Sequence, residues 1–298
     1  MMFHEIEFPL ASLSAESVEA ALFEVGASSI TFVDRGDEPV LEPRPGEFRL
    51  WSDTLVRGLF DEHSQPARTL DRLAALLGPH ITQTARVRPV KNQDWERAWL
   101  ADWKSMRFGR RLWVCPTAAD APADPDAVVV RLDPGLAFGT GTHPTTALCL
   151  QIVDSLPLSG RSVIDYGCGS GILGIAALKL GAAHVTAVDL DPQALLATRD
   201  NAARNGVSAD IEVQSVDPAG NDARLKPAFC VLANILAGPL IELAPVLTAA
   251  CEPLGCLVLS GLLTTQAYAV KAAYAAAFDK VQVVERDDWC CIYARRGV

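Results

Sequence analysis

The sequence predicts an α/β protein in two parts, a small N-terminal α+β domain followed by a domain with a mostly parallel sheet. From about residue 112 onward, apolar runs typical of strands alternate with segments of helical periodicity, as in a parallel sheet covered on both faces. Residues 1–90 instead follow the order β-α-β-β-α-β. A stretch rich in tryptophan and basic residues lies between them. We therefore expect domains at 1–90 and 112–298, joined by a linker at 91–111.

Composition and charge exclude several classes of protein. Half of the 298 residues are hydrophobic and 21% are charged, which provides apolar material for a sizeable core and excludes wholesale disorder. The 26 Lys+Arg against 36 Asp+Glu leave a net charge of −10, so we expect no general or sequence-specific binding of nucleic acid. An acidic surface instead attracts a basic partner.

The first residues and the cysteines indicate a cytoplasmic protein. Glu5 and Glu7 stand where a signal peptide has Lys or Arg and then a long apolar run. The most apolar region, residues 229–263, is interrupted by prolines and polar residues, so we expect no membrane span. The eight cysteines form no Cys-x-x-Cys pair, and most lie in apolar runs. We expect free, buried thiols in a reducing compartment and no metal site.

The N-terminal domain is expected to be a ferredoxin-like sandwich. Its strands are predicted at 5–8, 29–33, 48–59 and 82–87. One helix is predicted to begin at Ser12 or Ser14 and to end at Gly26, and a second to cover 66–77. This fold by itself implies no chemistry.

Residues 91–111 are expected to form a helical linker. Trp95, Trp99 and Trp103 recur at every fourth position, so they share one face of a helix. Such a stripe is more typical of packing than of ligand binding, and we expect it to dock a connecting helix onto a domain. Six Lys and Arg residues against three acids make this segment the basic island of the chain.

The C-terminal domain is expected to alternate strands and helices. Its strands are predicted at 128–132, 162–165, 184–188, 211–214, 229–233, 256–260, 281–285 and 291–294. Its helices are predicted at 145–156, 172–180, 192–205, 239–250 and 265–277. In such sheets, ligands bind at the carboxyl ends of the strands.

A glycine-rich loop follows the second of these strands. Asp165 ends the strand, and Gly167, Gly169 and Gly171 follow at every second position, where they allow the backbone to approach a ligand closely. The segment 169–174 also satisfies the dinucleotide fingerprint, which keeps a nicotinamide-dependent oxidoreductase open. A carboxylate at the strand end repels a pyrophosphate, however, whereas it attracts the ammonium and sulfonium of S-adenosylmethionine. We therefore favour S-adenosylmethionine, and the alternative for Asp165 is a cap of the following turn.

Two further strands end in polar residues. Asp189 lies 22 residues after Gly167, a spacing that suits a carboxylate accepting both ribose hydroxyls of an adenosine. Asp191 precedes Pro192 and is better interpreted as a helix N-cap, with a ligand contact as the alternative. Asn234 interrupts an apolar run where its strand ends. It either caps the next turn or accepts hydrogen bonds from an amine and orients the nitrogen lone pair toward a methyl group.

Together, these segments resemble the ribosomal protein L-eleven methyltransferases of the PrmA type. The resemblance rests on the segment 132–146, with the sequence Leu-Asp-Pro-Gly-Leu-Ala-Phe-Gly-Thr-Gly-Thr-His-Pro-Thr-Thr, on the Asp165 glycine loop, and on Asn-Ile-Leu-Ala at 234–237. It covers the chain from the linker to the C-terminus, whereas the first ninety residues match by position. Such enzymes have a class I, Rossmann-like methyltransferase fold.

The resemblance implies an S-adenosylmethionine-dependent protein methyltransferase that methylates lysine side chains and the N-terminal α-amine of ribosomal protein L-eleven. Residues 1–90 correspond to the family's substrate-recognition domain. The family's ligand contacts correspond to Thr146, or its neighbour Thr145, and to Gly167, Asp189 and Asn234. With the loop residues above, the expected cofactor site comprises Thr145, Thr146, Asp165, Gly167, Gly169, Gly171, Asp189 and Asn234, and Asn234 is the expected catalytic residue.

Several alternatives stay open. His143 invites a general-base interpretation, but a histidine before a proline at a helix start is more often a capping or packing residue. Phe138, in a glycine-rich segment typical of a lid, either covers the cofactor or belongs to the core. A small-molecule amine, RNA or a glutamine amide is an alternative acceptor, although Asn-Ile-Leu-Ala differs from the Asn/Asp-Pro-Pro-aromatic motif of adenine and glutamine-amide methylators. A non-catalytic adaptor with a relic cofactor site is the last alternative.

Overall fold

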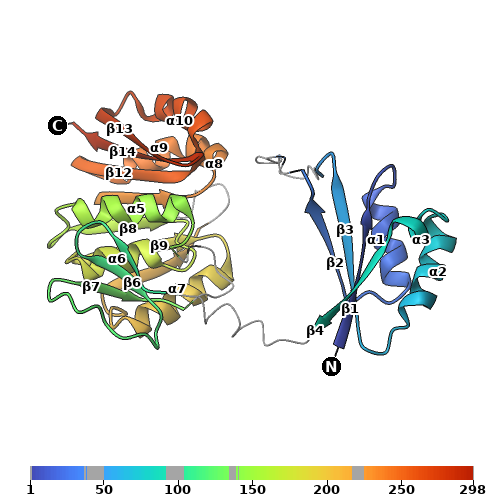
Figure 1. Cartoon of the computed structure of the whole chain (residues 1–298). Coiled ribbons are helices and arrows are strands. Elements are labelled where there is room, and N and C mark those ends of the chain that lie inside the picture. Colours follow the sequence, from blue (N-terminus) through green and yellow to red (C-terminus); the bar gives the residue numbers. More distant parts are fainter. Residues whose placement is uncertain are drawn as a thin grey trace. The chain divides into compact units, whose positions relative to one another are not determined.

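The computed structural model describes residues 2–36, 38, 50–91, 104–133, 139, 141–216 and 225–297. Its chain divides into two compact units, Met1–Ala98 and Trp99–Val298 (Figure 1). The division falls within the segment 91–111, where a linker is expected. The tryptophan stripe of that segment lies outside the described residues.

Unit 1 contains one four-stranded antiparallel sheet in the order β2-β3-β1-β4. Its strands are β1 (Met2–Pro9), β2 (Ser29–Asp34), β3 (Thr54–Phe60) and β4 (Arg86–Lys91). The helices are α1 (Ala15–Glu24), α2 (Pro66–Leu77) and the short α3 (Ile81–Thr84). This chain order and strand order are those of a ferredoxin-like sandwich, which confirms the predicted fold.

One face of this sheet forms the core of unit 1. Helix α1 begins at Ser14, whose hydroxyl accepts a hydrogen bond from the amide of Ser17 at 3.2 Å. The strands contribute alternate residues such as Phe8 and Val56, which pack against Leu22 of α1 and Leu73 of α2. The helices therefore lie on one side of the sheet, and we call the other side, on which no helix of the described residues lies, the helix-free face (Figure 1).

Two predicted strands of unit 1 are partly wrong. The strand predicted at 82–87 begins only at Arg86, because residues 81–84 form the helical turn α3. The hydroxyls of Thr82 and Thr84 donate to the carbonyls of Pro79 and His80 within this turn, and such local bonds compete with strand pairing. The strand predicted at 48–59 begins at Thr54.

Unit 2 is built on a seven-stranded sheet in the order β10-β9-β8-β11-β12-β14-β13. Its strands are β8 (Ser162–Tyr166), β9 (His184–Asp189), β10 (Ile211–Ser215), β11 (Ala228–Asn234), β12 (Cys251–Leu263), β13 (Phe278–Arg286) and β14 (Trp289–Arg296). The first five strands of the order pair in parallel, and β14 and β13 continue the sheet antiparallel. A smaller sheet, β5-β6-β7, comprises β5 (Met106–Phe108), β6 (Leu112–Cys115) and β7 (Val128–Arg131).

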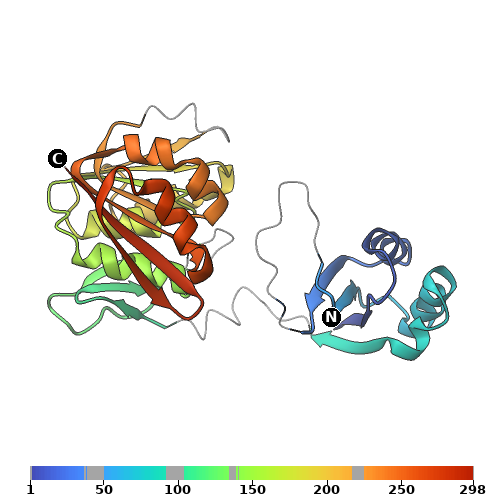
Figure 2. The same cartoon turned by 90° about the horizontal axis from the view of Figure 1, so that it is seen from above.

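Helices cover both faces of the large sheet (Figures 1 and 2). One hydrophobic cluster joins the sheet to α5 (Pro144–Ser155), α6 (Ile172–Lys179) and α7 (Pro192–Arg204). A second cluster joins the opposite face to α8 (Ala237–Glu242), α9 (Ala244–Ala249) and α10 (Ala267–Tyr274), with the 3-10 turn η2 (Thr264–Gln266) before α10. Residues of β8 alternate between the clusters, with Val163 in the first and Ile164 in the second. The three-layer architecture confirms the predicted parallel α/β fold.

Two predictions for unit 2 need correction. The helix predicted at 239–250 is two short helices, because Pro245 lacks the amide that would continue α8 and instead begins α9. The helical linker predicted up to Arg111 does not continue through residues 106–108, which form strand β5 and pair with β6. The basic island is thus in part the edge of the smaller sheet.

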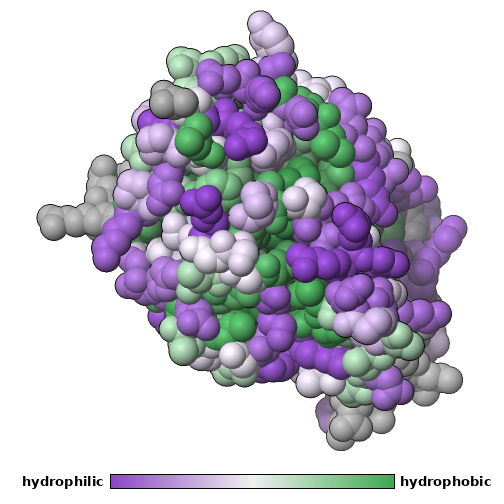
Figure 3. Space-filling view, turned by 90° about the vertical axis from the view of Figure 1, so that its left-hand side faces the viewer, coloured by the Kyte–Doolittle hydropathy of each residue, from purple (hydrophilic) through white to green (hydrophobic). Residues whose placement is uncertain are grey.

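No helix in the described ranges has the length and apolar character that a membrane crossing requires. Figure 3 shows one face of the molecule, on which hydrophilic residues are interspersed with smaller hydrophobic areas. All eight cysteines are free and buried, as predicted.

Asp154, on α5, fixes the start of β6 and generates a testable prediction. Its buried carboxylate accepts hydrogen bonds from the backbone amides of Arg110 at 2.5 Å and Leu112 at 3.1 Å, and also from that of Arg111. Because Asp154→Ala leaves these donors without a partner, we expect the free energy of unfolding of unit 2 to fall by about 3 kcal/mol. Urea denaturation measures this change.

Asp200→Ala is the matched control, since Asp200 is exposed on α7. We expect this variant to stay within about 0.5 kcal/mol of the wild type. An Asp154→Ala protein as stable as the control would show that the amides find other partners.

Candidate active site

The parallel register brings three sequence motifs to one edge of the large sheet. Tyr166 of β8 pairs with Val188 of β9 and with Ala233 of β11. The residues that follow these three in the chain, Gly167, Asp189 and Asn234, therefore lie at the same level of the sheet. The strand order reverses between β8 and β11, which is where open parallel sheets bind ligands.

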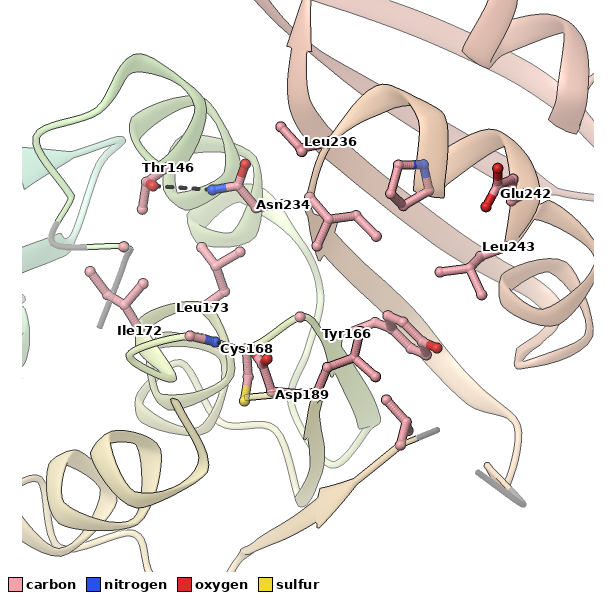
Figure 4. Close-up of a pocket in the computed structure, with 17 residues that line it drawn as sticks. Thr146, Tyr166, Cys168, Ile172, Leu173, Asp189, Asn234, Leu236, Glu242 and Leu243 are labelled. Atoms are coloured by element: carbon pink, nitrogen blue, oxygen red, sulfur yellow. Dashed lines mark hydrogen bonds between the residues drawn. The ribbon is translucent and has the colours of Figure 1, made fainter. Parts of the chain in front are cut away.

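A cavity of about 520 Å³ opens at this edge (Figure 4). This volume lies within the usual range for small-molecule sites. Five of the expected site residues line it, namely Thr146, Gly167, Gly169, Asp189 and Asn234. Its other lining residues are mostly apolar and comprise Gly139, Tyr166, Cys168, Ile172, Leu173, Leu190, Val216, Ile235, Leu236, Pro239, Glu242 and Leu243.

Asp189 is held in a defined orientation beside the glycine loop. One carboxylate oxygen accepts the amide hydrogen of Gly169 at 2.9 Å, and the other accepts that of Asp191 at 3.0 Å. The side chain is half-buried and lines the cavity, so each oxygen keeps a lone pair for a ligand. Asp191 itself accepts from the amide of Gln193 and caps α7, as predicted.

The glycine loop presents its backbone to the cavity. Gly167 has a φ of 72°, and an added Cβ would overlap Cγ2 of Ile235. Helix α7 holds the loop from behind, because the hydroxyl of Thr198 donates to the carbonyl of Gly169 and the amide of Asn201 donates to that of Ser170. The left-handed backbone and the close contact with Ile235 therefore require glycine at 167.

The side-chain amide of Asn234 has a hydrogen-bond partner at Nδ2 but, among the described residues, none at Oδ1. Alternation along β11 directs its side chain toward α5, where Nδ2 donates to Oγ1 of Thr146 at 3.1 Å (Figure 4). Its Oδ1 is buried and, among the described residues, has no hydrogen-bond partner. Buried oxygens of this kind are rare, because leaving them unpaired costs about 1–3 kcal/mol. An unpaired acceptor therefore belongs to a residue that lines the cavity.

Three expected site residues do not line the cavity. Asp165 is 1% exposed, and its carboxylate accepts the amide hydrogen of Gly174 in α6 at 2.8 Å, which corresponds to the capping alternative. Gly171 is the N-cap of α6 and packs beside Thr198. Thr145 is buried, and its hydroxyl forms a hydrogen bond with the ring of His143. Because side chains alternate between the two faces along β8, the side chain of Asp165 points beneath α6 and not into the cavity.

His143 has the capping and packing role that the sequence favours. Its Nδ1 lies 2.7 Å from Oγ1 of Thr145, and its ring packs edge-on against Trp289 with centroids 4.6 Å apart. Burial lowers the pKa of His143, so the ring is neutral at pH 7. Phe138 lies outside the described residues, whereas the neighbouring carbonyl of Gly139 accepts from Ser170 at 2.6 Å.

Sequence reasoning missed the opposite wall of the cavity. Tyr166, Glu242 and Leu243 line it (Figure 4), although no motif singles them out. Strand alternation places Tyr166 on the face opposite to Asp165, which is the one sequence signal for this wall. Within the described residues, no three His, Cys, Asp or Glu side chains form a group that would hold a metal ion.

Comparisons with known proteins identify the family. The family profile described as ribosomal protein L11 methyltransferase (PrmA) matches residues 2–297. This chain belongs to the ribosomal protein L11 methyltransferase family. A protein of that name from Sodalis glossinidius is 51% identical over 298 residues, which cover 99% of this chain and 100% of the relative. Its namesake from Photorhabdus laumondii is 53% identical over 280 residues, which cover 93% of each chain.

A solved structure of the same family supports the fold. The structure titled ribosomal protein L11 methylase from Lactobacillus delbrueckii subsp. bulgaricus is 33% identical, covers 66% of this chain and 100% of its own, and has a TM-score of 0.60. The predicted family and class I methyltransferase fold are thus confirmed, and S-adenosylmethionine is confirmed as the cofactor at the level of the family. The nicotinamide-dependent alternative is wrong.

The buried carboxyl of Asp165 predicts a pH dependence of stability. Burial raises the pKa of Asp165 to about 7, against the lowering effect of the Gly174 hydrogen bond, and the charge of Asp189 raises it further. Between its ordinary pKa of 3.8 and about 7, the folded chain keeps a proton that the unfolded chain has lost. The stability contributed by this proton is therefore lost as pH rises through that range, by a total on the order of 4 kcal/mol.

Asp165→Asn keeps an acceptor for Gly174 but has no proton to lose. We expect the unfolding free energy of the variant, minus that of the wild type, to increase from pH 4 to pH 7 and then to stay constant. Urea denaturation at a series of pH values measures it. Parallel curves for the two proteins would contradict a raised pKa for Asp165.

The close approach at Gly167 predicts a loss of cofactor binding in Gly167→Ala. Gly160 is a matched control, since it has the same φ of 72° and no atom within 4 Å of an added Cβ. Both variants incur the left-handed backbone strain, of about 1–2 kcal/mol, but only Gly167→Ala displaces Ile235 into the cavity. We expect the Kd for S-adenosylmethionine, measured by calorimetry, to rise at least about tenfold in Gly167→Ala and to change less than about twofold in Gly160→Ala. Equal effects would mean that strain alone matters.

Proposed function

We propose that this protein transfers methyl groups from S-adenosylmethionine to amines of ribosomal protein L11, namely lysine side chains and the N-terminal α-amine. Relatives that cover nearly the whole chain carry the name ribosomal protein L11 methyltransferase. The observation that carries the choice of an amine is the buried, unpartnered Oδ1 of Asn234, a residue that lines the cavity. An acceptor in that position suits a donor N–H on the substrate.

The residues of the cavity fit the cofactor. We assign the ribose hydroxyls to the carboxylate of Asp189, which is oriented by two backbone amides. The backbone of Gly167 and Gly169 approaches the ligand closely, and Thr146 and Asn234 are adjacent to its reactive end in this assignment. When bound, S-adenosylmethionine supplies an electrophilic methyl group on a sulfonium, so the protein has only to position the acceptor.

Asn234 is the proposed catalytic residue. Its Oδ1 accepts a hydrogen bond from the substrate amine and thereby directs the nitrogen lone pair toward the methyl carbon. A bound sulfonium would keep the electron pair of the C–S bond that breaks as the N–C bond forms. Thr146 fixes the amide of Asn234 by accepting from Nδ2, which leaves Oδ1 as the atom available to the substrate.

The apolar lining of the cavity assists deprotonation of the amine. A lysine has a pKa of about 10.4 in water, so few amines are neutral at pH 7. Ile235, Leu236 and Pro239 surround the approach to Asn234 with apolar surface, which disfavours an ammonium and lowers its pKa. No dedicated base is required, consistent with the capping role of His143.

Unit 1 is the proposed substrate-recognition part, corresponding to residues 1–90, and residues 112–298 are the proposed catalytic part. Residues 1–90 carry eight Lys+Arg against fourteen Asp+Glu, a net charge of −6, which favours association with a basic protein. A ribosomal substrate is available in the cytoplasm, which is the location that we infer for this enzyme.

Asn234→Ala tests the catalytic assignment. Because this variant loses the acceptor for the amine but keeps Asp189 and the glycine loop, we expect kcat for methyl transfer to fall about a hundredfold, while the Kd for S-adenosylmethionine changes less than about fivefold. Transfer of labelled methyl groups to purified ribosomal protein L11 and calorimetry measure the two quantities. Full activity of this variant would return Asn234 to a purely structural role.

Two threonine variants serve as a matched pair. Thr146→Val removes the acceptor that orients Asn234, whereas Thr145→Val changes a neighbouring buried threonine that does not line the cavity. We expect kcat to fall about tenfold in the first and to stay near the wild-type value in the second. In all of these assays, labelled wild-type product is mapped by mass spectrometry. The proposed function is wrong if neither free ribosomal protein L11 nor ribosomes become labelled.

A further inference from the structure

The helix-free face of the sheet in unit 1 carries a second pocket. Because Phe8 and Val56 point into the core beneath α1 and α2, the alternate residues Glu7 of β1 and Arg57 of β3 point to the opposite face. Arg86 of β4 pairs with Glu7 across the neighbouring strand. A pocket of about 280 Å³ lies here, distinct from the active-site cavity, which belongs to unit 2.

Arginines dominate this pocket. Four of its lining residues are Arg35, Arg57, Arg86 and Arg88, and its one lining acid is Glu7, so the lining carries a formal net charge of +3. We call these five residues the arginine pocket. Their sign is opposite to the net charge of −6 over residues 1–90. The arginine pocket is therefore a local reversal of charge on an acidic part of the chain.

Glu7 organises the arginine pocket from within. Its carboxylate is 4% exposed and bonds with Nη2 of Arg88 at 2.5 Å and with Nε of Arg57 at 3.3 Å. Each oxygen thus has a guanidinium partner, and the two arginines are held in position. Glu5 also lies 3.9 Å from Nε of Arg57, so two carboxylates balance these two guanidiniums.

The remaining two arginines are available to a ligand. Arg86 is exposed, and no carboxylate of the described residues lies within 4.0 Å of its guanidinium. Arg35 meets Asp53 at 3.6 Å, but both side chains are about half exposed, and such pairs contribute little energy. A guanidinium presents paired N–H donors that match the two oxygens of a carboxylate.

We propose that the arginine pocket binds a carboxylate side chain of the protein substrate. This inference rests on the proposed function, since it names the chemistry by which unit 1 recognises that substrate. The acidic surface attracts a basic protein from many directions, whereas the arginine pocket accepts only an acid. The positively charged arginine pocket therefore selects one orientation of the bound protein. Complementary charges determine how a partner is oriented more than how tightly it binds.

Arg86→Glu tests the proposal, and Arg68→Glu is its matched control. Arg68 is exposed on α2, on the helix-covered side of the sheet, and the two variants change the net charge equally. We measure the Kd for free ribosomal protein L11 by calorimetry and the KM and kcat for its methylation. We expect Kd and KM to rise about tenfold in Arg86→Glu with kcat unchanged, and to change less than about twofold in Arg68→Glu.

A rescue experiment identifies the carboxylate. Each Asp or Glu of ribosomal protein L11 is changed to Lys in turn, and we expect one such substrate to bind Arg86→Glu more tightly than it binds the wild type. Arg86→Ala, which removes the charge without reversing it, is expected to give a smaller loss than Arg86→Glu. Circular dichroism verifies that the variants fold.

Equal affinity of Arg86→Glu and wild type, or an equal loss in Arg68→Glu, overturns the proposal. A loss on ribosomes but not on free ribosomal protein L11 also overturns it and assigns the arginine pocket to an RNA phosphate. Absence of wild-type methylation refutes the proposed function instead, and the calorimetric comparison of the two variants then still decides whether the pocket binds this protein.

Discussion

The parallel register of β9, β8 and β11 is the constraint on which the site depends. Strands of one direction, paired in register, end together, so residues that are far apart in the sequence leave the sheet at one level. A slip of one residue in β11 would turn Asn234 away from α5 and present Ala233 or Ile235 instead. The pairing of the sheet backbone therefore brings Asp189, the glycine loop and Asn234 together, and no further long-range interaction is needed for them to meet.

Precision within the site comes from the helices behind it rather than from the loops themselves. Helix α5 supplies Thr146, which orients Asn234, and α7 supplies Thr198 and Asn201, which hold the carbonyls of the glycine loop. These side chains are buried, so their hydrogen bonds are shielded from water. Loops that carry function are thus given a defined shape by elements whose own conformation is fixed by packing.

The sequence predicts the sheet better than the exact role of each site residue. Motif spacing predicts Asp189 and Asn234 at one edge, because strand ends in a parallel sheet share it, and both line the cavity there. The same logic places Asp165 at that edge, but its side chain lies under α6 and does not line the cavity. Which face a residue occupies depends on strand alternation, and which of two threonines meets Asn234 depends on helix rotation. The wall of Tyr166 and Leu243 comes from packing between distant segments, for which no local pattern exists.

Cys168 gives the cavity a chemical property beyond its shape. It lines the wall beside the glycine loop, and burial, together with the charge of Asp165, raises the pKa of its thiol well above the ordinary value. Only a thiolate is a strong nucleophile, and at neutral pH this sulfur keeps its proton. The burial that packs Cys168 into the core therefore also keeps its sulfur in the weakly nucleophilic thiol form.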